Sequence, residues 1–433
     1  MTYYDCRPGG SLSGSIRVPG DKSISHRSII LSSIADGTSR ITGFLEGEDS
    51  LNTLKAFQAM GVSIERKDDH ILVDGVGING LRQPREKLDM GNSGTAMRLL
   101  IGLLAGQDFD SELVGDASLS MRPMNRVINP LKTMGAVIDS EMNGTAPIKI
   151  HGQSSLRPIE YDMPMASAQV KSCLLLAGLY ANGETIVREP APTRDHTERM
   201  LRGSGCEVST NRNEIRIAGG QRLKANDIDV PADISSAAFF LVAASIAANS
   251  CLTLEHVGVN PTRTGVIDIL KLMGADIKLS NRREIGGEPV ADLTVCSAVL
   301  QGIDIPEELV PLAIDEFPVL FVAAACAEGT TRLTGAAELR VKESDRIQTM
   351  ADGLKILGIN ALPAEDGMTI TGGQIGQGEI DSHGDHRIAM AFSVASLRAS
   401  GAIKILNCAN VDTSFPGFVQ LASSAGIRIK SHD

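Results

Sequence analysis

The amino-acid sequence predicts an α/β fold, and two observations carry that prediction. Six segments read as the end of an amphipathic helix, then a glycine, then a short strand. In chain order their glycines are Gly61, Gly135, Gly205, Gly274, Gly358 and Gly426. A more apolar helix followed by a strand precedes each of these segments. Because successive glycines lie 68 to 84 residues apart, the pattern indicates an internal repeat rather than chance.

The amphipathic segments are typical of helices that end at a glycine. In order they are residues 54–64, 128–138, 200–208, 267–277, 350–361 and 418–429. A helix C-terminus commonly requires a left-handed residue, which glycine adopts without a steric penalty. Val or Ile follows each glycine within three residues, as a short strand favours.

The apolar segments predict helices that are buried on all sides. In order they are residues 25–43, 94–106, 167–187, 234–254, 314–335 and 385–406. A helix that is apolar nearly all round belongs in a core, so the pattern suggests helices inside and sheets outside. Six units of about 70 residues fit either one closed ring or two groups of three, and the pattern leaves this open.

Composition excludes several classes of protein. A chain of 433 residues suggests two or three domains. Asp and Glu number 52 against 41 Lys and Arg, aromatic residues make up 3%, and Trp is absent. A nucleic-acid-binding protein usually has the opposite charge balance and aromatic stacking platforms. An anionic ligand must therefore be bound by a local cluster of cations.

The cysteines and the apolar runs bear on location. The seven cysteines are scattered and form no CxxC pair, which argues against a disulfide framework or a zinc–thiolate site. No apolar run approaches the ~20 residues of a membrane helix, and the polar N-terminus does not resemble a signal peptide. We expect a soluble cytoplasmic protein.

Charged and hydroxyl side chains stand where the predicted buried helices begin. The string GDKSISHR places Lys22, Ser23 and Arg27 after a glycine turn, and a helix N-terminus with such side chains suits an anion. The alternative is a capped helix with a solvated face. The string is not a P-loop, because Asp21 stands where GxxxxGK[ST] requires its second glycine.

Four further strings in the first half of the chain have similar features. GNSGTAMR contains Gly94, where main-chain N–H groups can approach a ligand, and SMRP places Arg122 beside a rigid proline. MASAQVK places Ser167 and Gln169 at a helix start, and PTRDHTE contains Arg194. The alternatives are a tight turn, a surface arginine, a helix cap and a structural salt-bridge network.

The second half of the chain supplies carboxylates together with cations. If LRVKESDR opens a helix, Lys342 and Arg346 share a face. Glu343 then lies between two cations that keep it ionised and available for proton transfer. A solvated helix start is the alternative. Asp315 enters a buried helix, either as a reactive carboxylate or as its cap.

The string GDHR opens another buried helix. Its Arg387 suits bidentate binding of a carboxylate. His383 and His386 provide two ligands without a third, so no metal is expected. Taken together, the strings indicate a site between two halves of the chain for a small polyanion with phosphate and carboxylate groups.

These strings together resemble one family, 5-enolpyruvylshikimate-3-phosphate synthase, whose reaction is the sixth step of the shikimate pathway. The matching strings are GDKSISHR, GNSGTAMR, MASAQVK, RVKESDRI, GDHRIAMAF and TSFPGF, and they extend from residue 20 to residue 418. MASAQVK and PTRDHTE are similar to the bacterial class II form.

The resemblance implies a two-domain inside-out α/β barrel with six βαβαββ repeats, three in each domain. It implies one discontinuous domain of residues 1–19 and 232–433 and a second domain of residues 20–231. The hinge is expected near residues 19–21 and 229–233, and a monomer is expected.

The resemblance also implies the reaction. The enolpyruvyl group of phosphoenolpyruvate passes to the 5-hydroxyl of shikimate 3-phosphate through a tetrahedral intermediate, phosphate is released, and no cofactor is needed. The pathway leads to chorismate and the aromatic amino acids, and glyphosate is the expected inhibitor. We expect no nucleic-acid or membrane partner.

Roles for individual residues follow by position in the matching strings. The implied catalytic residues are Asp315, Glu343, Lys22 and His386. The implied shikimate 3-phosphate ligands are Lys22, Ser23, Arg27, Ser167, Gln169, Arg194, Asp315 and Lys342. The implied phosphoenolpyruvate ligands are Lys22, Gly94, Arg122, Gln169, Arg346 and Arg387.

The chain departs from the family at one place, and two alternatives remain open. Thr413 precedes Ser414 where some members have a lysine, so one phosphoenolpyruvate-side cation is missing. A UDP-N-acetylglucosamine enolpyruvyl transferase shares the fold and chemistry but uses a loop cysteine, and residues 108–124 contain none. A non-catalytic repeat scaffold would not need cations at the ends of buried helices.

Overall fold

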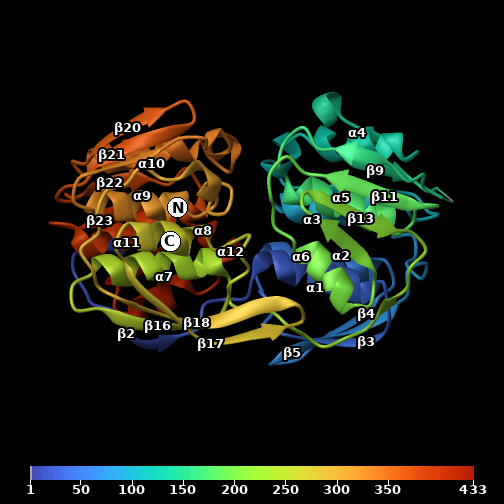
Figure 1. Ribbon diagram of the computed structural model, residues 1–433, viewed down its shortest axis with the longest axis horizontal. Helices are drawn as coiled ribbons and strands as arrows, with labels where there is room; N and C mark the ends of the chain where they lie inside the picture. Colours follow the sequence, from blue (N-terminus) through green and yellow to red (C-terminus); the bar gives the residue numbers. More distant parts are fainter. Residues whose placement is uncertain (1, 154) are drawn as a thin grey trace. The chain divides into compact units, whose positions relative to one another are not determined.

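The computed structural model describes residues 2–153 and 155–433 and divides them into two compact units (Figure 1). Unit 1 consists of residues 2–19, 231–283 and 289–433, and unit 2 of residues 20–230 and 284–288. Each unit has its own hydrophobic core. The expectation of an α/β fold is confirmed, since both units combine helices with sheets.

Unit 2 contains three sheets with one shared pattern. Their strand orders are β14–β3–β5–β4, with β15 also on β3, then β6–β7–β9–β8 and β10–β11–β13–β12. In each sheet the first pair is parallel and the following pairs are antiparallel. The strands are β3 (Ala35–Thr42), β4 (Ser63–Arg66), β5 (His70–Val76), β6 (Leu88–Asp89), β7 (Ser111–Val114), β8 (Val137–Ser140), β9 (Ile148–His151), β10 (Glu160–Asp162), β11 (Glu184–Arg188), β12 (Val208–Asn211), β13 (Glu214–Ala218), β14 (Leu223–Lys224) and β15 (Ile228–Asp229).

Buried helices form the interior of unit 2. The α-helices are α1 (Lys22–Ser33), α2 (Glu48–Ala59), α3 (Gly94–Leu104), α4 (Asn125–Thr133), α5 (Ala168–Gly178) and α6 (His196–Gly203). Two short 3₁₀ helices are η1 (Leu119–Met121) and η2 (Met142–Gly144). Helix α3 packs against α5, and α1 packs against α2 and α6. Most residues of α1, α3 and α5 are buried. The buried residues include polar ones, such as His26 and Arg27 in α1 and Lys171 in α5.

Unit 1 also contains three sheets, with strand orders β22–β23–β1–β24, β17–β18–β16–β2 and β19–β21–β20. The N-terminal strand β1 completes a sheet of the C-terminal segment, where Tyr4 lies opposite Ile405 on one side and Ser431 on the other. The strands are β1 (Tyr3–Cys6), β2 (Ser13–Ile16), β16 (Cys251–Gly258), β17 (Asp276–Ile285), β18 (Glu288–Cys296), β19 (Thr330–Leu333), β20 (Asn360–Ala364), β21 (Gly367–Thr371), β22 (Gly378–Asp381), β23 (Ile403–Leu406) and β24 (Ile429–His432).

The interior of unit 1 is also helical. The α-helices are α7 (Ile234–Ile246), α8 (Gly265–Leu272), α9 (Phe317–Cys326), α10 (Arg346–Ile356), α11 (His386–Ala395), α12 (Val411–Ser414) and α13 (Phe418–Ala425). The 3₁₀ helices are η3 (Glu307–Leu309), η4 (Ala337–Val341) and η5 (Ser396–Arg398). Helices α7, α9 and α11 pack against one another, so their N-terminal residues come from three distant parts of the chain.

Within residues 2–153 and 155–433, the expected barrel is not present as a closed sheet. Every sheet formed by the described residues has an open strand order, and none closes on itself. The six-repeat count stays a prediction. The six glycines of the repeat do occupy the predicted left-handed region, with φ from 79° to 117°.

Two further features differ from the sequence analysis. The tip of the β17–β18 hairpin, residues 284–288, belongs to unit 2, although the expected division placed residues 232–433 together. Cys251 and Cys296, directly opposite each other on β16 and β18, form a disulfide where none was expected. No helix among the described residues has the length and apolar character needed to cross a membrane.

Candidate active site

The N-terminus of α1 holds the first group of charged side chains in unit 2. Asp21 caps the helix, accepting a hydrogen bond from the main-chain N–H of Ile24 at 2.8 Å. Lys22, the first residue of α1, forms an ion pair with Asp49 near the start of α2. The ion pair holds the ammonium group in place, and the Lys22 side chain is 29% exposed.

Arg27 lies one turn further along α1 and is almost fully buried. Its Nε donates to Oγ1 of Thr197 at 2.7 Å, and its Nη2 donates to Oγ of Ser172 at 2.8 Å. Its Nη1 donates to the main-chain oxygen of Ser23 at 2.9 Å. Burial lowers the pKa of Arg27 to about 10, an effect that nearby carboxylates partly offset. The guanidinium therefore keeps its charge at neutral pH and joins α1, α5 and α6.

A second group surrounds the start of α3. Ser93 caps the helix by accepting a hydrogen bond from the N–H of Ala96 at 3.2 Å, and Gly94 is the first helical residue. Arg98, one turn on, donates from Nη1 to Oε1 of Gln169 on α5 at 2.6 Å. A Cβ atom at Gly94 would lie 2.9 Å from Nη1 of Arg98 and 3.6 Å from Nη1 of Arg122. Gly94 thus allows two guanidinium groups to approach the helix end.

Arg122 reaches that helix end from the end of η1. Its Nη2 donates to Oδ1 of Asn92 at 2.6 Å and to Oγ of Ser118 at 3.1 Å, and its Nη1 lies 3.4 Å from the main-chain oxygen of Asn92. These partners are neutral oxygens, so they orient the guanidinium without cancelling its charge.

Helix α5 and the segment before α6 supply the remaining predicted residues of unit 2. Ser167 caps α5 by accepting a hydrogen bond from the N–H of Val170, at 3.4 Å. The Gln169 amide accepts from Arg98 and donates from Nε2 to Oγ1 of Thr95 at 2.9 Å. Arg194, in the segment before α6, is half-buried, and its charge lowers the pKa of Arg27.

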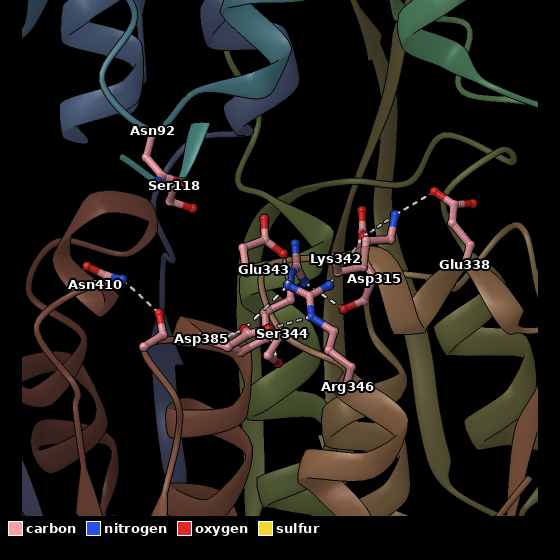
Figure 2. A network of polar contacts seen from close by, with 12 residues as sticks. Asn92, Ser118, Asp315, Glu338, Lys342, Glu343, Ser344, Arg346, Asp385 and Asn410 are labelled. Carbon is pink, nitrogen blue, oxygen red and sulfur yellow. Dashed lines mark hydrogen bonds and ion pairs between the residues drawn. The ribbon is translucent and has the colours of Figure 1, made fainter. Parts of the chain in front are cut away.

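In unit 1, a carboxylate with two cations lies where η4, α9 and α10 meet (Figure 2). Nζ of Lys342 and Nη1 of Arg346 each lie 3.6 Å from Oδ1 of Asp315. Nζ of Lys342 also donates to Oε1 of Glu338 at 2.7 Å. Two cations at this distance stabilise the negative charge of Asp315, whose side chain is 16% exposed.

Arg346 is buried and is surrounded by carboxylates. Its Nε donates to Oδ2 of Asp385 at 2.8 Å, and its Nη2 donates to Oε2 of Glu343 at 2.6 Å. Burial alone would lower the pKa of Arg346, but Asp385, Glu343 and Asp315 together raise it. Burial likewise acts to raise the pKa of Asp385, and Arg346 holds it below the usual value. Both groups are therefore charged at neutral pH, and Figure 2 shows Arg346 between the two carboxylates.

The N-terminus of α11 contributes Arg387 and His386. Asp385 caps this helix by accepting a hydrogen bond from the main-chain N–H of Arg387 at 2.9 Å. Nη1 of Arg387 donates to the main-chain oxygen of Asp315 at 2.9 Å and lies 3.9 Å from Oε1 of Glu316. His386 is the first residue of α11 and is half-buried. Arg387 is thus fixed beside the segment that carries Asp315.

The structure brings the predicted residues together in two sets, one in each unit. The set in unit 2 contains Lys22, Ser23, Arg27, Gly94, Arg122, Ser167, Gln169 and Arg194. The set in unit 1 contains Asp315, Lys342, Glu343, Arg346, His386 and Arg387. The members lie at or beside the N-termini of α1, α3, α5, α6, α9, α10 and α11. In the described part of the chain, no group of three His, Cys, Asp or Glu residues is placed to hold a metal ion.

One expectation about the unit 1 set is wrong in its local structure. Lys342 and Arg346 were expected to share a face if LRVKESDR opened a helix, but Lys342 follows η4 in extended backbone, and α10 begins only at Arg346. Asp345 is the N-cap, accepting from the N–H of Gln348 at 3.0 Å, and so ends the irregular segment. The two cations meet at Asp315 from different elements.

The sequence analysis missed two residues of these sets. Arg98 holds Gln169, and its signal was the last letter of GNSGTAMR. Asp385 holds Arg346 and caps α11, and its signal was its place before the predicted helix in GDHR. Both were visible as residues, but nothing local in the sequence indicated their partners.

Named relatives match nearly the whole chain. The family model described as EPSP synthase (3-phosphoshikimate 1-carboxyvinyltransferase) matches residues 6–421. The 3-phosphoshikimate 1-carboxyvinyltransferase of Alkalilimnicola ehrlichii is 64% identical over 432 residues, which cover 99% of this chain and 97% of that protein. The protein of the same name from Hydrogenovibrio crunogenus is 62% identical, covering 98% of each chain.

Solved structures agree with these matches. EPSP synthase from Acinetobacter baumannii superposes with a TM-score of 0.93 at 57% identity and covers 100% of both chains. The enolpyruvyl transferase NikO from Streptomyces tendae superposes with a TM-score of 0.82 at 17% identity, covering 100% of this chain and 99% of NikO. At that identity the second likeness concerns the fold alone.

Proposed function

This chain belongs to the EPSP synthase (3-phosphoshikimate 1-carboxyvinyltransferase) family, and from that premise we propose that the helix ends of its two units act on one pair of substrates. The reaction is the transfer of the enolpyruvyl group of phosphoenolpyruvate to the 5-hydroxyl of shikimate 3-phosphate, with release of phosphate. The product leads to chorismate and the aromatic amino acids. The carrying observation is the family match over residues 6–421.

Shikimate 3-phosphate is assigned to residues that combine charge with hydroxyl and amide groups. The proposed ligands are Lys22, Ser23, Arg27, Ser167, Gln169, Arg194, Asp315 and Lys342. A phosphate group at the ends of α1 and α5 would meet main-chain N–H groups and the helix dipoles as well as the cations. The exposed part of Lys22 supports this placement.

Phosphoenolpyruvate is assigned to the guanidinium groups. The proposed ligands are Lys22, Gly94, Arg122, Gln169, Arg346 and Arg387. The neutral partners of Arg122 leave its charge available for a phosphate. Arg387, fixed by the main-chain oxygen of Asp315, suits a carboxylate close to the reacting hydroxyl.

Proton transfer is assigned to two carboxylates and two basic groups. Asp315 takes the proton of the 5-hydroxyl as the hydroxyl oxygen attacks the carbon of phosphoenolpyruvate that carries the phosphate. Glu343 and Lys22 serve proton transfer at the enol methylene and at the leaving phosphate, with His386 in support. Addition converts the methylene into a methyl group and gives a tetrahedral intermediate. Loss of phosphate together with one proton of that methyl group restores the double bond. The fixed cations stabilise the negative charge of this intermediate.

The remaining expectations are parts of the same proposal. The two compact units are proposed as the two domains, with the hinge near residues 19–21 and 229–233. We propose a cytoplasmic monomer that uses no cofactor, and glyphosate as an inhibitor that competes for the phosphoenolpyruvate ligands. Closure of the two domains on the substrates would bring the cations of both units to them and exclude water during the reaction.

The test is phosphate release by the purified protein with both substrates present. We expect release only when phosphoenolpyruvate and shikimate 3-phosphate are both supplied, and the same rate after treatment with a metal chelator. UDP-N-acetylglucosamine in place of shikimate 3-phosphate should give no phosphate. Release with that nucleotide sugar, or no release with the proper pair, would overturn the proposal.

A further inference from the structure

A buried group of three charges lies between α5 and α6 and has no part in the reaction described above. Lys171 is 1% exposed, and its Nζ lies 2.8 Å from Oε1 of Glu198 and 3.1 Å from Oε2 of Glu189. The side chains of Glu198 and Glu189 are 2% and 8% exposed. Removing three charged groups from water is costly, and apolar residues of similar size are often as stable. Stability alone is therefore a weak reason for this group.

The ends of α5 and α6 are already joined without Lys171. Oγ1 of Thr197 donates to Oγ of Ser172 at 2.7 Å, and Arg27 donates to both hydroxyls. These neighbours follow Lys171 on α5 and precede Glu198 on α6. An ion pair at the same junction is not needed to join the two helices.

The ammonium group of Lys171 also fixes the segment that follows β11, residues 189–194. Nζ of Lys171 donates to the main-chain oxygen of Thr193 at 3.4 Å, and Oγ1 of Thr193 donates to Oε2 of Glu189 at 2.6 Å. Thr193 is thus held through both its main chain and its side chain. The next residue is Arg194, which lies close enough to lower the pKa of Arg27. Fixing residue 193 limits where the Arg194 guanidinium can lie.

We propose that Lys171 is a positioning residue for shikimate 3-phosphate, acting through Thr193 on Arg194. The ammonium group touches no substrate. It holds the segment of residues 189–194 in one conformation. Arg194 is therefore already ordered before the substrate binds, and binding does not incur the entropy cost of ordering it. This inference rests on the proposed function for the identity of the substrate.

The experiment compares Lys171→Met with Lys149→Met, the same substitution at an exposed position of β9. Lys171→Met should raise KM for shikimate 3-phosphate about tenfold, with KM for phosphoenolpyruvate within about twofold and kcat within about threefold of the unmodified enzyme. Lys149→Met should leave all three unchanged. Equal increases in both KM values, or no increase, would overturn the inference.

A double-mutant cycle with Arg194→Met tests the route. If Lys171 acts through Arg194, adding Lys171→Met to Arg194→Met should raise KM for shikimate 3-phosphate by less than about twofold more. Independent multiplication of the two effects would contradict the inference. Should Lys171→Met fail to fold, the Lys171→Met, Glu189→Gln, Glu198→Gln variant, in which all three groups are uncharged, replaces it, with the same expected KM increase and the same contradicting results.

The failure of the inference differs from a failure of the proposed function. If the unmodified protein releases no phosphate from the two substrates, the proposed function fails first. If the unmodified protein is active and the Lys171 variants keep its KM for shikimate 3-phosphate, only the inference fails. Thr193→Val, which removes one contact of the segment, should give an increase of about threefold, and no increase there would count against the route.

Discussion

Three arginines of unit 2 and the cations of the unit 1 set are held by different kinds of partner, while Lys22 of unit 2 pairs with Asp49. In unit 2, Arg27, Arg98 and Arg122 donate to hydroxyl, amide and main-chain oxygens. In unit 1, three cations lie among five carboxylates, and the residues concerned are Lys342, Arg346 and Arg387 with Asp315, Glu316, Glu338, Glu343 and Asp385.

This difference in partners indicates that the two sets of helix ends have different roles. Neutral partners orient a guanidinium and leave its charge to attract an anion. Carboxylate partners balance the charge, and the cation in turn keeps each carboxylate ionised and in place. We therefore expect unit 2 to dominate the binding of phosphate groups, and unit 1 to dominate proton transfer.

The largest expected effect is on the rate, in unit 1. Asp315→Asn keeps the shape of the side chain and removes its ability to accept a proton, so kcat should fall about 10³-fold. Steady-state kinetics measure this. The control is Glu338→Gln, a carboxylate that also contacts Lys342 but is 51% exposed, and it should stay within about threefold. If Asp315→Asn keeps a tenth of kcat, the assignment of proton transfer to the carboxylates of unit 1 is wrong.

The second prediction compares the stability of the two sets. Asp385→Asn leaves the buried Arg346 without its main partner and should lower the free energy of unfolding by about 3 kcal/mol. Asn92→Ala in unit 2 removes one neutral partner of the half-buried Arg122, the Asn92 Oδ1, and should cost about 1 kcal/mol. Urea denaturation of both variants measures the contrast, and equal losses would refute the distinction between the two kinds of partner.

The third prediction concerns anion binding in unit 2. Arg122→Met removes a guanidinium whose hydrogen bonds run to Asn92 and Ser118. KM for phosphoenolpyruvate should rise about 30-fold, which corresponds to about 2 kcal/mol, with little loss of stability. Kinetics at two salt concentrations check the assignment, because the increase should be larger at low salt. A variant whose KM is unchanged would remove Arg122 from the site.

The fourth prediction uses the close approach of two guanidinium groups to Gly94. In Gly94→Ala the new methyl group meets Nη1 of Arg98 at 2.9 Å, and the end of that flexible side chain must shift. The inhibition constant for glyphosate should rise about tenfold, with a smaller rise in KM for phosphoenolpyruvate. An inhibition assay on both proteins measures this, and equal inhibition would refute the steric argument.

The smallest predicted effect is a pH dependence that comes from the burial of His26 in unit 2. His26 is buried between Thr53 and Ser93, and its burial lowers its pKa to about 3, with Lys22 and Arg27 acting in the same direction. The unfolded state, with a pKa near 6.5, binds the proton that the folded state excludes. Stability due to this group is therefore complete above pH 6.5 and falls as the pH falls towards 3.

Between pH 6.5 and 5.5 the expected loss is about 1 kcal/mol. Urea denaturation at both pH values measures it, with His26→Gln as the control because glutamine retains a hydrogen-bonding group and does not titrate. If the difference in unfolding free energy between the two proteins is the same at both pH values, the claim that folding lowers the pKa of His26 is wrong.

The helices and their ends could be predicted from the sequence, because they depend on residues that are close together in the chain. The glycines of the repeat were predicted to end helices, and they occupy the left-handed region. The sheets could not be assigned, since strands far apart in the chain pair with one another. Tyr4 lies opposite Ile405, for example. The same distance hid the disulfide between Cys251 and Cys296, which depends on the register of two strands.

The candidate site was predicted as a set of residues rather than as a geometry. Motifs at helix starts indicated Lys22, Arg122 and Arg387, because charges at the ends of buried helices require a reason. They did not indicate which carboxylate holds which cation. Arg346 and Asp385 are 39 residues apart in sequence, and their contact depends on how α10 and α11 pack.

The structure of the Asp315→Asn variant with both substrates bound tests the central claim most directly, because the slowed reaction lets the substrates persist in the crystal. We predict that Lys22 and Arg122 from unit 2 and Arg387 from unit 1 all lie within hydrogen-bond distance of the same substrate pair. Substrates held by residues of one unit alone, with Lys22 or Arg387 remote from both, would contradict the account.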